Sequence, residues 1–310
     1  MPKELVALLI VLGAILILFI IFTFMVGFIY FNRVFRRKKA NFEGNFHMNA
    51  TGDDHPDKLW LDSLNKEEIT MKSYDKLNLK AYFVDNDGST KLAILVHGYH
   101  GSYRSLAYQA RMFYNHGFSL LLINNRCHDT SEGKYFTMGQ RETRDLKDWI
   151  NLMINRNDNF RITLFGVSMG GHIVMMSADK LPFNVMCAIE DCGFTSTYRQ
   201  MLYTSQVTNA PMFKYSTFAA SIVARLFFGF SCHNNAKHTL SKARIPFLFM
   251  HGNLDGLVPY ANLDRAASYF PKNIHKEVVT FEDCDHCEQV HRQKDKYEAR
   301  LFGFVDKFIK

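Results

Sequence analysis

The stretch that decides the fold is ITLFGVSMGG, residues 162–171. Its first four residues have the apolar character of a buried strand, and the residues from Gly170 onward have that of a helix. Between the two, Gly166 and Gly170 flank Ser168 at the spacing G-x-S-x-G. A sharp strand-to-helix turn strains such a serine, which flanking glycines make sterically possible, and exposes its hydroxyl at the helix N-terminus. The five letters alone occur by chance in many proteins, but their position here predicts that Ser168 is a nucleophile.

Short apolar runs alternate with longer helical patterns on both sides of this turn. We expect strands at residues 69–74, 79–84, 92–96, 118–123, 162–165, 185–189, 246–250 and 277–281. We expect helices at residues 104–116, 140–155, 170–181 and 261–270, and a C-terminal helix ending near Phe308. Because strands that alternate with helices form parallel sheets covered on both faces, the predicted fold is α/β, with a mostly parallel, doubly wound sheet that begins with a hairpin. Such sheets bind ligands beyond the carboxyl ends of their strands.

One segment, residues 197–243, breaks the alternation because it contains no run typical of a strand. It is rich in aromatic residues and methionine, and its place after the strand at 185–189 predicts a helical cap inserted over the active site. Its apolar side chains are suited to line a pocket for an acyl group. For any single one of them, packing of the cap onto the rest of the domain is at least as good an explanation.

A serine hydroxyl becomes a good nucleophile only when a base takes its proton, and in folds with this turn the chain order is serine, acid, histidine. Asp255 follows the strand at 246–250, which predicts that it is the acid. The alternative is a turn former, since Asp-Gly is a common turn pair. His286 follows the last expected strand, 277–281, and is the predicted base. The three residues therefore occur in the required order.

The oxyanion of an acyl-transfer intermediate also needs hydrogen-bond donors, which are often backbone amides. The N–H of Met169, the residue after the nucleophile, is the first predicted donor. In such folds the second donor comes from the loop after the third strand, here residues 97–101, and we assign it to the backbone N–H of Tyr99. Together such donors supply several kcal/mol of transition-state stabilisation.

Five motifs together resemble the α/β-hydrolase superfamily, and within it bacterial membrane-anchored hydrolases with the pattern HG(Y)xxS, GVSMGG, EDCGYTS, HGxxDxxVP and a late histidine. In this sequence they stand at residues 97–99, 166–171, 190–196 and 251–259 and at His286. The resemblance covers roughly residues 65–310. It implies an α/β-hydrolase fold with a serine nucleophile, and it implies no substrate.

The loop after the fourth strand departs from this family pattern. Where the family usually has DxRGHGxSEG, residues 124–133 read NNRCHDTSEG, so the glycine positions have changed. The detailed conformation of this loop, which would border the active site, therefore does not follow from the family pattern. A milder change is Cys287, which follows His286 where a small residue is usual.

The N-terminal segment is apolar, and from Leu5 to Phe31 it contains no charged residue. A helix of this length rises about 40 Å, more than the ~30 Å hydrocarbon core of a bilayer, so it can cross with tilt. A secretory signal peptide is the competing interpretation. It predicts a shorter apolar stretch and a small-residue cleavage site, which the residues after Phe31 do not offer. We therefore expect an uncleaved transmembrane helix over residues 5–31.

Basic residues gather on one side of this helix. Five lysines and arginines follow it within residues 33–39, and only Lys3 precedes it. By the positive-inside rule the C-terminal side, and with it the catalytic domain, is expected on the cytoplasmic face of the cell membrane. The predicted organisation is an anchor at 1–40, a polar, turn-rich linker at 41–64 and a hydrolase domain at 65–310.

The net charge of +7 does not indicate a nucleic-acid partner. Residues 1–40 hold six of the 37 basic residues and one of the 30 acidic residues, which leaves +2 for the rest of the chain. The excess charge thus lies beside the apolar segment, and no pattern of a basic, aromatic groove is present either. We therefore expect no nucleic acid among the partners.

The six cysteines are expected to be reduced and buried, since a domain of this size needs no disulfides. The stretch Cys-Asp-His-Cys at 284–287 resembles half of a metal site. A structural zinc site commonly needs two such pairs, and the sequence has no second C-x-x-C, so we predict no metal and no cofactor. His100, His128 and His172 lie near the expected site, and a structural or surface role is the better interpretation of each.

Together these features predict a membrane-anchored serine hydrolase that cleaves a carboxylic ester or thioester through an acyl-enzyme on Ser168. The expected substrate is a small-molecule or lipid-like acyl compound. A peptidase or an acyltransferase would use the same three residues and stays open. The other alternative is a membrane-tethered binding protein without turnover, against which the presence of all three residues and of the oxyanion loop argues.

Overall fold

The computed structural model describes residues 1–37 and 54–310, and this part of the chain forms two compact units. We call them the anchor unit (Met1–Arg36 with Tyr198–His233) and the body (Arg37–Thr197 with Asn234–Lys310). Residues 41–53 of the expected linker, and the basic residues Lys38 and Lys39, lie outside the described residues.

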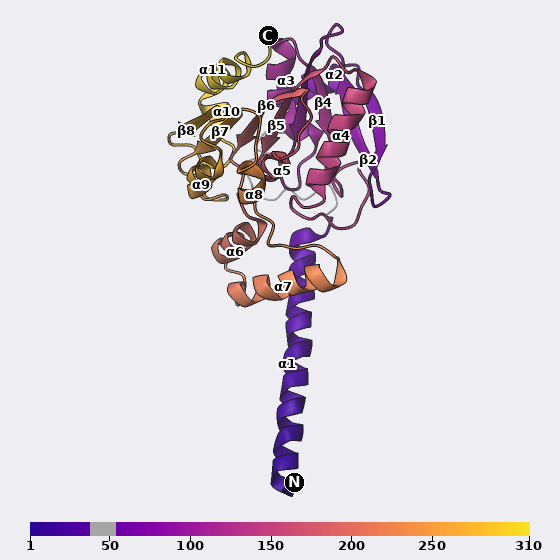
Figure 1. Cartoon of the computed structure of the whole chain (residues 1–310), viewed down its shortest axis with the longest axis vertical. Helices are drawn as coiled ribbons and strands as arrows, with labels where there is room; N and C mark the ends of the chain where they lie inside the picture. The colour runs from indigo at the N-terminus through magenta and orange to yellow at the C-terminus, as the bar shows by residue number, and fades with distance from the viewer. Residues whose placement is uncertain (38–53) are drawn as a thin grey trace. The chain divides into compact units, whose positions relative to one another are not determined.

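The body is built around one sheet of eight strands (Figure 1). The strands are β1 (Glu67–Lys72), β2 (Asn78–Val84), β3 (Lys91–Val96), β4 (Ser119–Ile123), β5 (Arg161–Val167), β6 (Val185–Asp191), β7 (Phe247–Gly252) and β8 (Lys276–Phe281). Their order across the sheet is β1-β2-β4-β3-β5-β6-β7-β8. β2 runs antiparallel to both β1 and β4, and all the other neighbours are parallel. The predicted mostly parallel, doubly wound sheet with an N-terminal hairpin is therefore confirmed.

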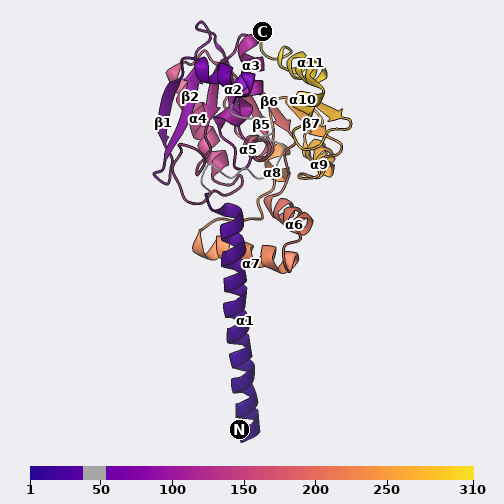
Figure 2. The ribbon, with the colours of Figure 1, turned by 180° about the vertical axis from the view of Figure 1, so that it is seen from behind.

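Helices cover both faces of this sheet, as the opposite views in Figure 1 and Figure 2 show. One face carries α2 (Pro56–Ser63), the short 3-10 helix η2 (Tyr103–Leu106), α3 (Ala107–Asn115), α10 (Gln289–Arg292) and α11 (Lys294–Val305). The other carries α4 (Glu142–Arg156), α5 (Met169–Ser177), α8 (Lys237–Leu240) and α9 (Ala261–Tyr269). β3 and β4 lie in the interior of the sheet and are buried almost throughout, which explains their continuous apolar runs.

The sequence did not predict α2, which lies within the segment expected to be a linker. Pro56 occupies the first turn of α2, where backbone N–H groups have no partner within the helix, so that the N–H that proline lacks is not needed. The His55 side chain accepts a hydrogen bond from the N–H of Asp57 and so caps the helix. Leu61 is fully buried in the core of the body. Because Leu61 is the only apolar residue of α2 that is fully buried, the helical period was too weak to stand out among polar neighbours.

The anchor unit contains α1 (Lys3–Phe35), α7 (Phe213–Phe227) and all of α6 (Thr197–Val207) except its first residue. α6 and α7 form the insertion between β6 and β7, so the predicted insertion is helical. In both views α7 runs across the C-terminal part of α1 (Figure 1 and Figure 2). Within the described residues, α1 is the one helix that is long and apolar enough to cross a membrane.

α1 and α7 approach each other closely because small residues meet at their crossing. A Cβ added at Gly27 would lie 2.7 Å from the carbonyl oxygen of Ala219 and 2.8 Å from Cγ2 of Val223, so a larger residue on α1 would force the helices apart. Phe28 packs against Phe227 beside the crossing, with ring centroids 4.9 Å apart. The sequence did not predict this packing of the inserted helix on the N-terminal helix.

Candidate active site

Ser168 lies in the turn between β5 and α5. Its backbone has φ 57° and ψ −116°, a conformation that residues other than glycine rarely adopt. A Cβ on Gly166 would lie 2.3 Å from the carbonyl oxygen of Gly170, and one on Gly170 would lie 2.0 Å from that of Val96. The two glycines thus let the strand, the turn and the end of β3 approach each other. This is the strained strand-to-helix turn that the sequence predicted.

The structure brings Ser168, Asp255 and His286 together. The Ser168 hydroxyl oxygen and His286 Nε2 are 3.0 Å apart, and His286 Nδ1 and Asp255 Oδ2 are 2.6 Å apart. All three side chains are buried. They follow β5, β7 and β8 at the carboxyl edge of the sheet, where sheets of this type place their ligands. A hydroxyl, an imidazole and a carboxylate in this order can pass the serine proton to the imidazole.

Asp255 is fixed by backbone amides and by a second histidine. Its Oδ1 accepts hydrogen bonds from the N–H groups of Leu257 (2.9 Å) and Val258 (2.7 Å), and its Oδ2 lies 3.1 Å from His251 Nε2. Burial alone would raise the pKa of Asp255, but His286 and His251 lower it to about 2. Asp255 therefore both closes a turn and faces the histidine as a carboxylate. Sequence analysis gave His251 no role, although its place in the HGxxDxxVP motif was an available signal.

His286 is held in the loop after β8. Its backbone N–H donates to Asp285 Oδ1 at 2.6 Å, and the same oxygen accepts the N–H of Gly256 at 2.8 Å, which ties this loop to that of Asp255. Burial lowers the pKa of His286, whereas Cys192 and the Asp255 carboxylate raise it, and the result is a pKa well above the usual value. The site therefore favours the imidazolium that forms when His286 takes a proton from a hydroxyl.

Two acidic residues at the end of β6, Glu190 and Asp191, support the turn at Ser168. Glu190 Oε2 accepts the N–H of Gly193 at 2.9 Å. The carbonyl oxygen of Asp191 accepts a hydrogen bond from the N–H of Ser168 at 2.8 Å. The Asp191 side chain accepts one from the hydroxyl of Tyr297 at 2.6 Å. Burial raises the pKa of both carboxyl groups. Sequence analysis recorded the two residues as part of a motif without assigning either of them a role.

The two predicted oxyanion donors lie on elements that meet at the turn around Ser168. Met169 is the first residue of α5, where backbone N–H groups have no carbonyl partner within the helix. Tyr99 is in the loop that follows β3, whose last residue, Val96, lies close against Gly170. The Tyr99 ring packs on Phe136, with ring centroids 5.3 Å apart. The role of both amides as donors stays a prediction.

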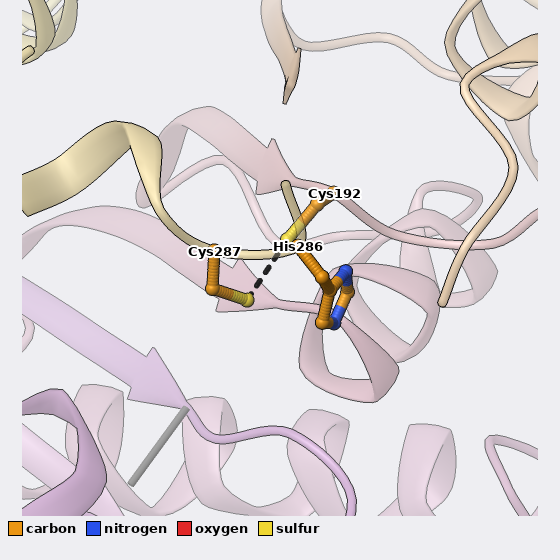
Figure 3. Close-up of side chains that lie close together, drawn as sticks. All are labelled: Cys192, His286 and Cys287. Atoms are coloured by element: carbon orange, nitrogen blue, oxygen red, sulfur yellow. Dashed lines mark hydrogen bonds between the residues drawn. The ribbon is translucent and has the colours of Figure 1, made fainter. Parts of the chain in front are cut away.

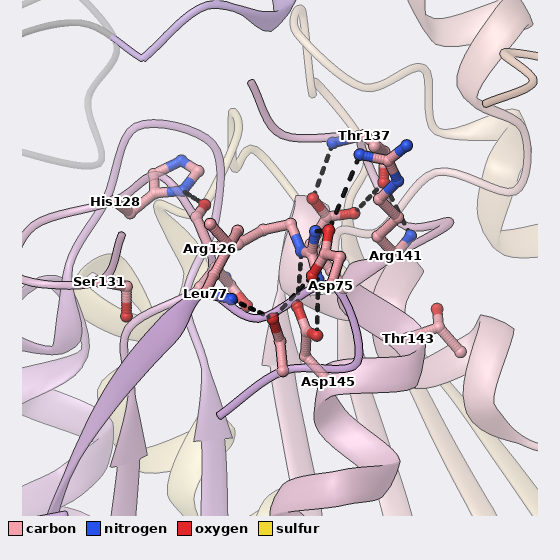
Figure 4. Close-up of polar contacts among 12 residues, drawn as sticks. Asp75, Leu77, Arg126, His128, Ser131, Thr137, Arg141, Thr143 and Asp145 are labelled. Carbon is pink, nitrogen blue, oxygen red and sulfur yellow. Dashed lines mark hydrogen bonds and ion pairs between the residues drawn. The ribbon is translucent and has the colours of Figure 1, made fainter. Parts of the chain in front are cut away.

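The loop after β4 forms without the glycines of the family pattern, and Figure 4 draws the polar contacts around it. Cys127 and Asp129 occupy those positions, and both have positive φ, 65° and 42°. The buried guanidinium of Arg126 holds the base of the loop, because it donates two hydrogen bonds to Asp145 and two to Asp75. Removing one partner of such a buried ion pair costs about 3–5 kcal/mol. The cluster therefore fixes Arg126, the residue that precedes Cys127 in the loop.

The cysteines, together with His100, His128 and His172 near the expected site, are the other residues to which the sequence gave a structural role. The six cysteines, all in the described part of the chain, form no disulfide, and five of them are buried. His172 Nδ1 donates to the carbonyl oxygen of Phe194 at 2.6 Å, and burial lowers the pKa of His172 to about 4. His128 Nε2 accepts the backbone N–H of His100 at 3.1 Å.

Known proteins resemble this chain over most of its length. The Bacillus subtilis (strain 168) protein YqkD is 22% identical over 317 residues, which cover 99% of this chain and 98% of YqkD. The Pyrococcus furiosus esterase Pf2001 superimposes with a TM-score of 0.65 at 20% identity, covering 80% of this chain and 93% of the esterase. The α/β hydrolase GrgF from Penicillium sp. sh18 superimposes with a TM-score of 0.59 at 15% identity, covering 79% and 99%.

At these identities the solved structures establish the shared α/β-hydrolase fold alone. The family is established by a separate match, in which the sequence profile of the prolyl oligopeptidase family covers residues 104–310. That match includes Ser168, Asp255 and His286 and more than half of the chain. The chain therefore belongs to the prolyl oligopeptidase family, whose members are α/β hydrolases.

Proposed function

We propose that the protein is a membrane-anchored serine hydrolase that cleaves a carboxylic ester or thioester through an acyl-enzyme on Ser168. The observation that carries this proposal is the buried chain of contacts from the Ser168 hydroxyl through His286 to Asp255, at 3.0 and 2.6 Å. These are the groups that acyl transfer to a serine requires. Membership of a hydrolase family supports the same reaction class.

In the proposed reaction each group has a distinct role. Ser168 attacks the acyl carbonyl while His286 Nε2 takes its proton, and Asp255 stabilises the imidazolium that forms. The N–H groups of Met169 and Tyr99 donate to the oxyanion. The leaving alcohol or thiol takes the proton from His286. A water molecule, activated by the same histidine, then releases the acid from Ser168.

A peptidase is the second candidate, and the family match favours it. The same residues would cleave an amide, with His286 protonating the leaving amine. The similarity in fold to the esterase Pf2001 supports the ester instead. Hydrolysis of p-nitrophenyl esters of graded chain length should therefore exceed hydrolysis of a proline-containing peptide p-nitroanilide. Faster turnover of the anilide would replace our proposal by the peptidase, and transfer of the acyl group to an added alcohol would indicate an acyltransferase.

We propose further that α1 anchors the protein and that the body is cytoplasmic. The side chains of α1 are mostly exposed and apolar between residues 5 and 21, a surface that a bilayer would cover. A cysteine introduced at Asn45 should then resist a membrane-impermeant thiol reagent in intact cells and react after permeabilisation. Ready labelling in intact cells would place the body outside. A mature protein that begins after residue 31 by mass spectrometry would show a cleaved signal sequence instead.

The test of the nucleophile is labelling of the membrane-bound protein by a fluorophosphonate probe. Wild type should be labelled and Ser168→Ala should not. Ser177, in the last turn of α5, provides the matched control, because its hydroxyl donates to the Val174 carbonyl at 2.7 Å; Ser177→Ala should keep the label. Labelling of Ser168→Ala would disprove the assignment. Absence of labelling in folded wild type would favour the binding protein.

A further inference from the structure

Two thiols lie side by side next to His286 (Figure 3). Cys192 directly follows β6 and Cys287 directly follows His286, and their sulfur atoms are 3.2 Å apart. One ligand atom from each of the three residues, the two sulfur atoms and a ring nitrogen of His286, lies within 4.8 Å of the other two. The reaction described above uses neither thiol. The cluster is therefore a group of potential metal ligands that shares His286 with the candidate active site.

Sequence analysis rejected a metal site because the chain has only one C-x-x-C pair, Cys284 with Cys287. In the structure the partner of Cys287 is instead Cys192, 95 residues earlier in the chain. Cys284 faces elsewhere, since its sulfur accepts a hydrogen bond from the Gln293 side chain at 3.4 Å. The fold thus makes a pair of thiols that no sequence motif marks.

This set of side chains suits a thiophilic divalent cation. Two thiolates and an imidazole are common ligands of zinc, and three protein ligands leave a fourth position for water. Around a tetrahedral ion with Zn–S distances of about 2.3 Å, two sulfur atoms are roughly 3.8 Å apart. The sulfur atoms of Cys192 and Cys287 would therefore have to separate by only about 0.6 Å, which small side-chain rotations provide.

One of the two thiols also borders a small cavity. Cys287 is partly exposed, in contrast to the five buried cysteines. It lines a small cavity of about 40 Å³ together with Val167 and His291. A space of this size accommodates roughly one water molecule beside the Cys287 sulfur. Cys192 and His286 do not line it, so an ion would have to pass Cys287 to reach all three side chains.

We propose that Cys192, Cys287 and His286 bind Zn²⁺ and that the bound ion inhibits the hydrolase. Both thiols lose a proton to the solvent, and a protonated His286 loses one as well before its nitrogen binds the ion, so that binding involves no oxidation or reduction. His286 Nδ1 faces Asp255 and Nε2 faces Ser168, so an ion on either nitrogen replaces one of the two contacts of the triad. The inhibition rests on the proposed function, whereas the binding does not.

Binding is measured on the full chain in detergent with a phosphine reductant, which keeps the thiols from forming a disulfide. The probe is Cd²⁺, whose thiolate complexes absorb in the ultraviolet. We expect one tightly bound Cd²⁺ per chain in wild type and in Ser168→Ala. Cys192→Ser and Cys287→Ser should each weaken binding at least about tenfold, since loss of even an outer-shell partner costs about 10–100-fold. Cys284→Ser, from the same C-x-x-C stretch, is the matched control and should bind as wild type does.

Inhibition is measured as loss of fluorophosphonate labelling and of ester hydrolysis when Zn²⁺ is added. Mg²⁺ and Ca²⁺, which prefer oxygen ligands, should have no such effect. Equal Cd²⁺ affinity in wild type and in the Cys192→Ser, Cys287→Ser double variant would refute the site. Tight binding with unchanged labelling of Ser168 would refute the inhibition.

The two proposals fail separately. Tight binding of Cd²⁺ by Ser168→Ala, combined with absence of labelling in folded wild type from which a chelator has removed all metal, would refute the hydrolase and support the metal site. Thermal unfolding of each variant identifies any that is misfolded. If a serine variant is misfolded because serine buries a hydroxyl, Cys192→Ala or Cys287→Ala gives the same binding test without that hydroxyl.

Discussion

Acid should destabilise the body through two buried histidines, His97 and His172. Both side chains are fully buried, and burial is the main cause that lowers the pKa of His172 to about 4 and that of His97 to about 3. In an unfolded chain the pKa of histidine is about 6.5. The unfolded state therefore binds protons more readily than the native state. The stability that the protein gains because both histidines are neutral is complete above about pH 6.5. It falls as the pH drops from there towards the native pKa values.

The size of the effect follows from these values. Each pH unit between the unfolded and the native pKa costs up to about 1.4 kcal/mol per histidine. Between pH 7 and pH 5 protonation of His172 in the unfolded state should therefore lower the free energy of unfolding by about 2 kcal/mol. His97 should add a loss of similar size. For His172 the loss ends near pH 4, where the native state also takes up the proton.

The assay is urea unfolding of the full chain in detergent at pH 7, 6 and 5, followed by the fluorescence of the buried Trp149. In His172→Gln the loss of unfolding free energy between pH 7 and pH 5 should be smaller than in wild type by about 2 kcal/mol. The exposed His238 on α8 supplies the control variant His238→Gln. If His172→Gln lost as much stability between pH 7 and pH 5 as wild type does, the reasoning would be refuted, because His172 would then not be held neutral.

Asp255→Asn should lower kcat/KM for p-nitrophenyl butyrate by roughly 10⁴-fold with an intact circular dichroism spectrum, because an amide no longer stabilises the imidazolium; a loss of less than about tenfold would mean that another acid orients the histidine. Gly27→Ala should lower the unfolding temperature in detergent, since its new methyl would lie 2.7 Å from the Ala219 carbonyl oxygen. Gly13→Ala is its control, because a Cβ there meets nothing within 4 Å, and equal unfolding temperatures of the two variants would contradict the close crossing. Arg126→Ala should cost about 3–5 kcal/mol in urea unfolding, because it leaves two carboxylates without their buried partner; a loss below about 1 kcal/mol would be typical of a surface pair instead.

The features that the sequence predicted are those that depend on local chemistry or on chain order. The turn at Ser168 needs glycines at fixed neighbouring positions, so residues 162–171 were sufficient to predict it. Asp255 and His286 could be assigned because loops that follow parallel strands meet at one edge of a sheet. Their order in the chain then left few choices, and the contacts of 3.0 and 2.6 Å join the same three residues.

The features that the sequence did not predict depend on contacts between distant segments. Cys192 and Cys287 both follow strands whose carboxyl ends share one edge of the sheet, but chain order does not predict which side chains touch there, and no motif pairs these two thiols. His251 stood in a recognised motif, but its contact with Asp255 depends on how the loop after β7 turns back. α2 was hidden for a different reason, since its stability comes from burying Leu61 in a core that the polar segment 54–64 does not reveal.

For the membrane anchor that we propose, the crossing of α1 by α7 accounts for an apolar N-terminal run that is longer than a membrane requires. About 20 apolar residues span the hydrocarbon core, whereas the run from Leu5 to Phe31 has no charge over a longer distance. The side chains of its first part are exposed, but Gly27, Tyr30 and Phe31 are buried, and Gly27 lies against α7. Two different requirements therefore produce one continuous apolar pattern, because lipid and a packed helix select the same kinds of side chain. Gly27 is one position that distinguishes the two requirements, since lipid around the proposed anchor would tolerate a larger residue there and the carbonyl oxygen of Ala219 does not.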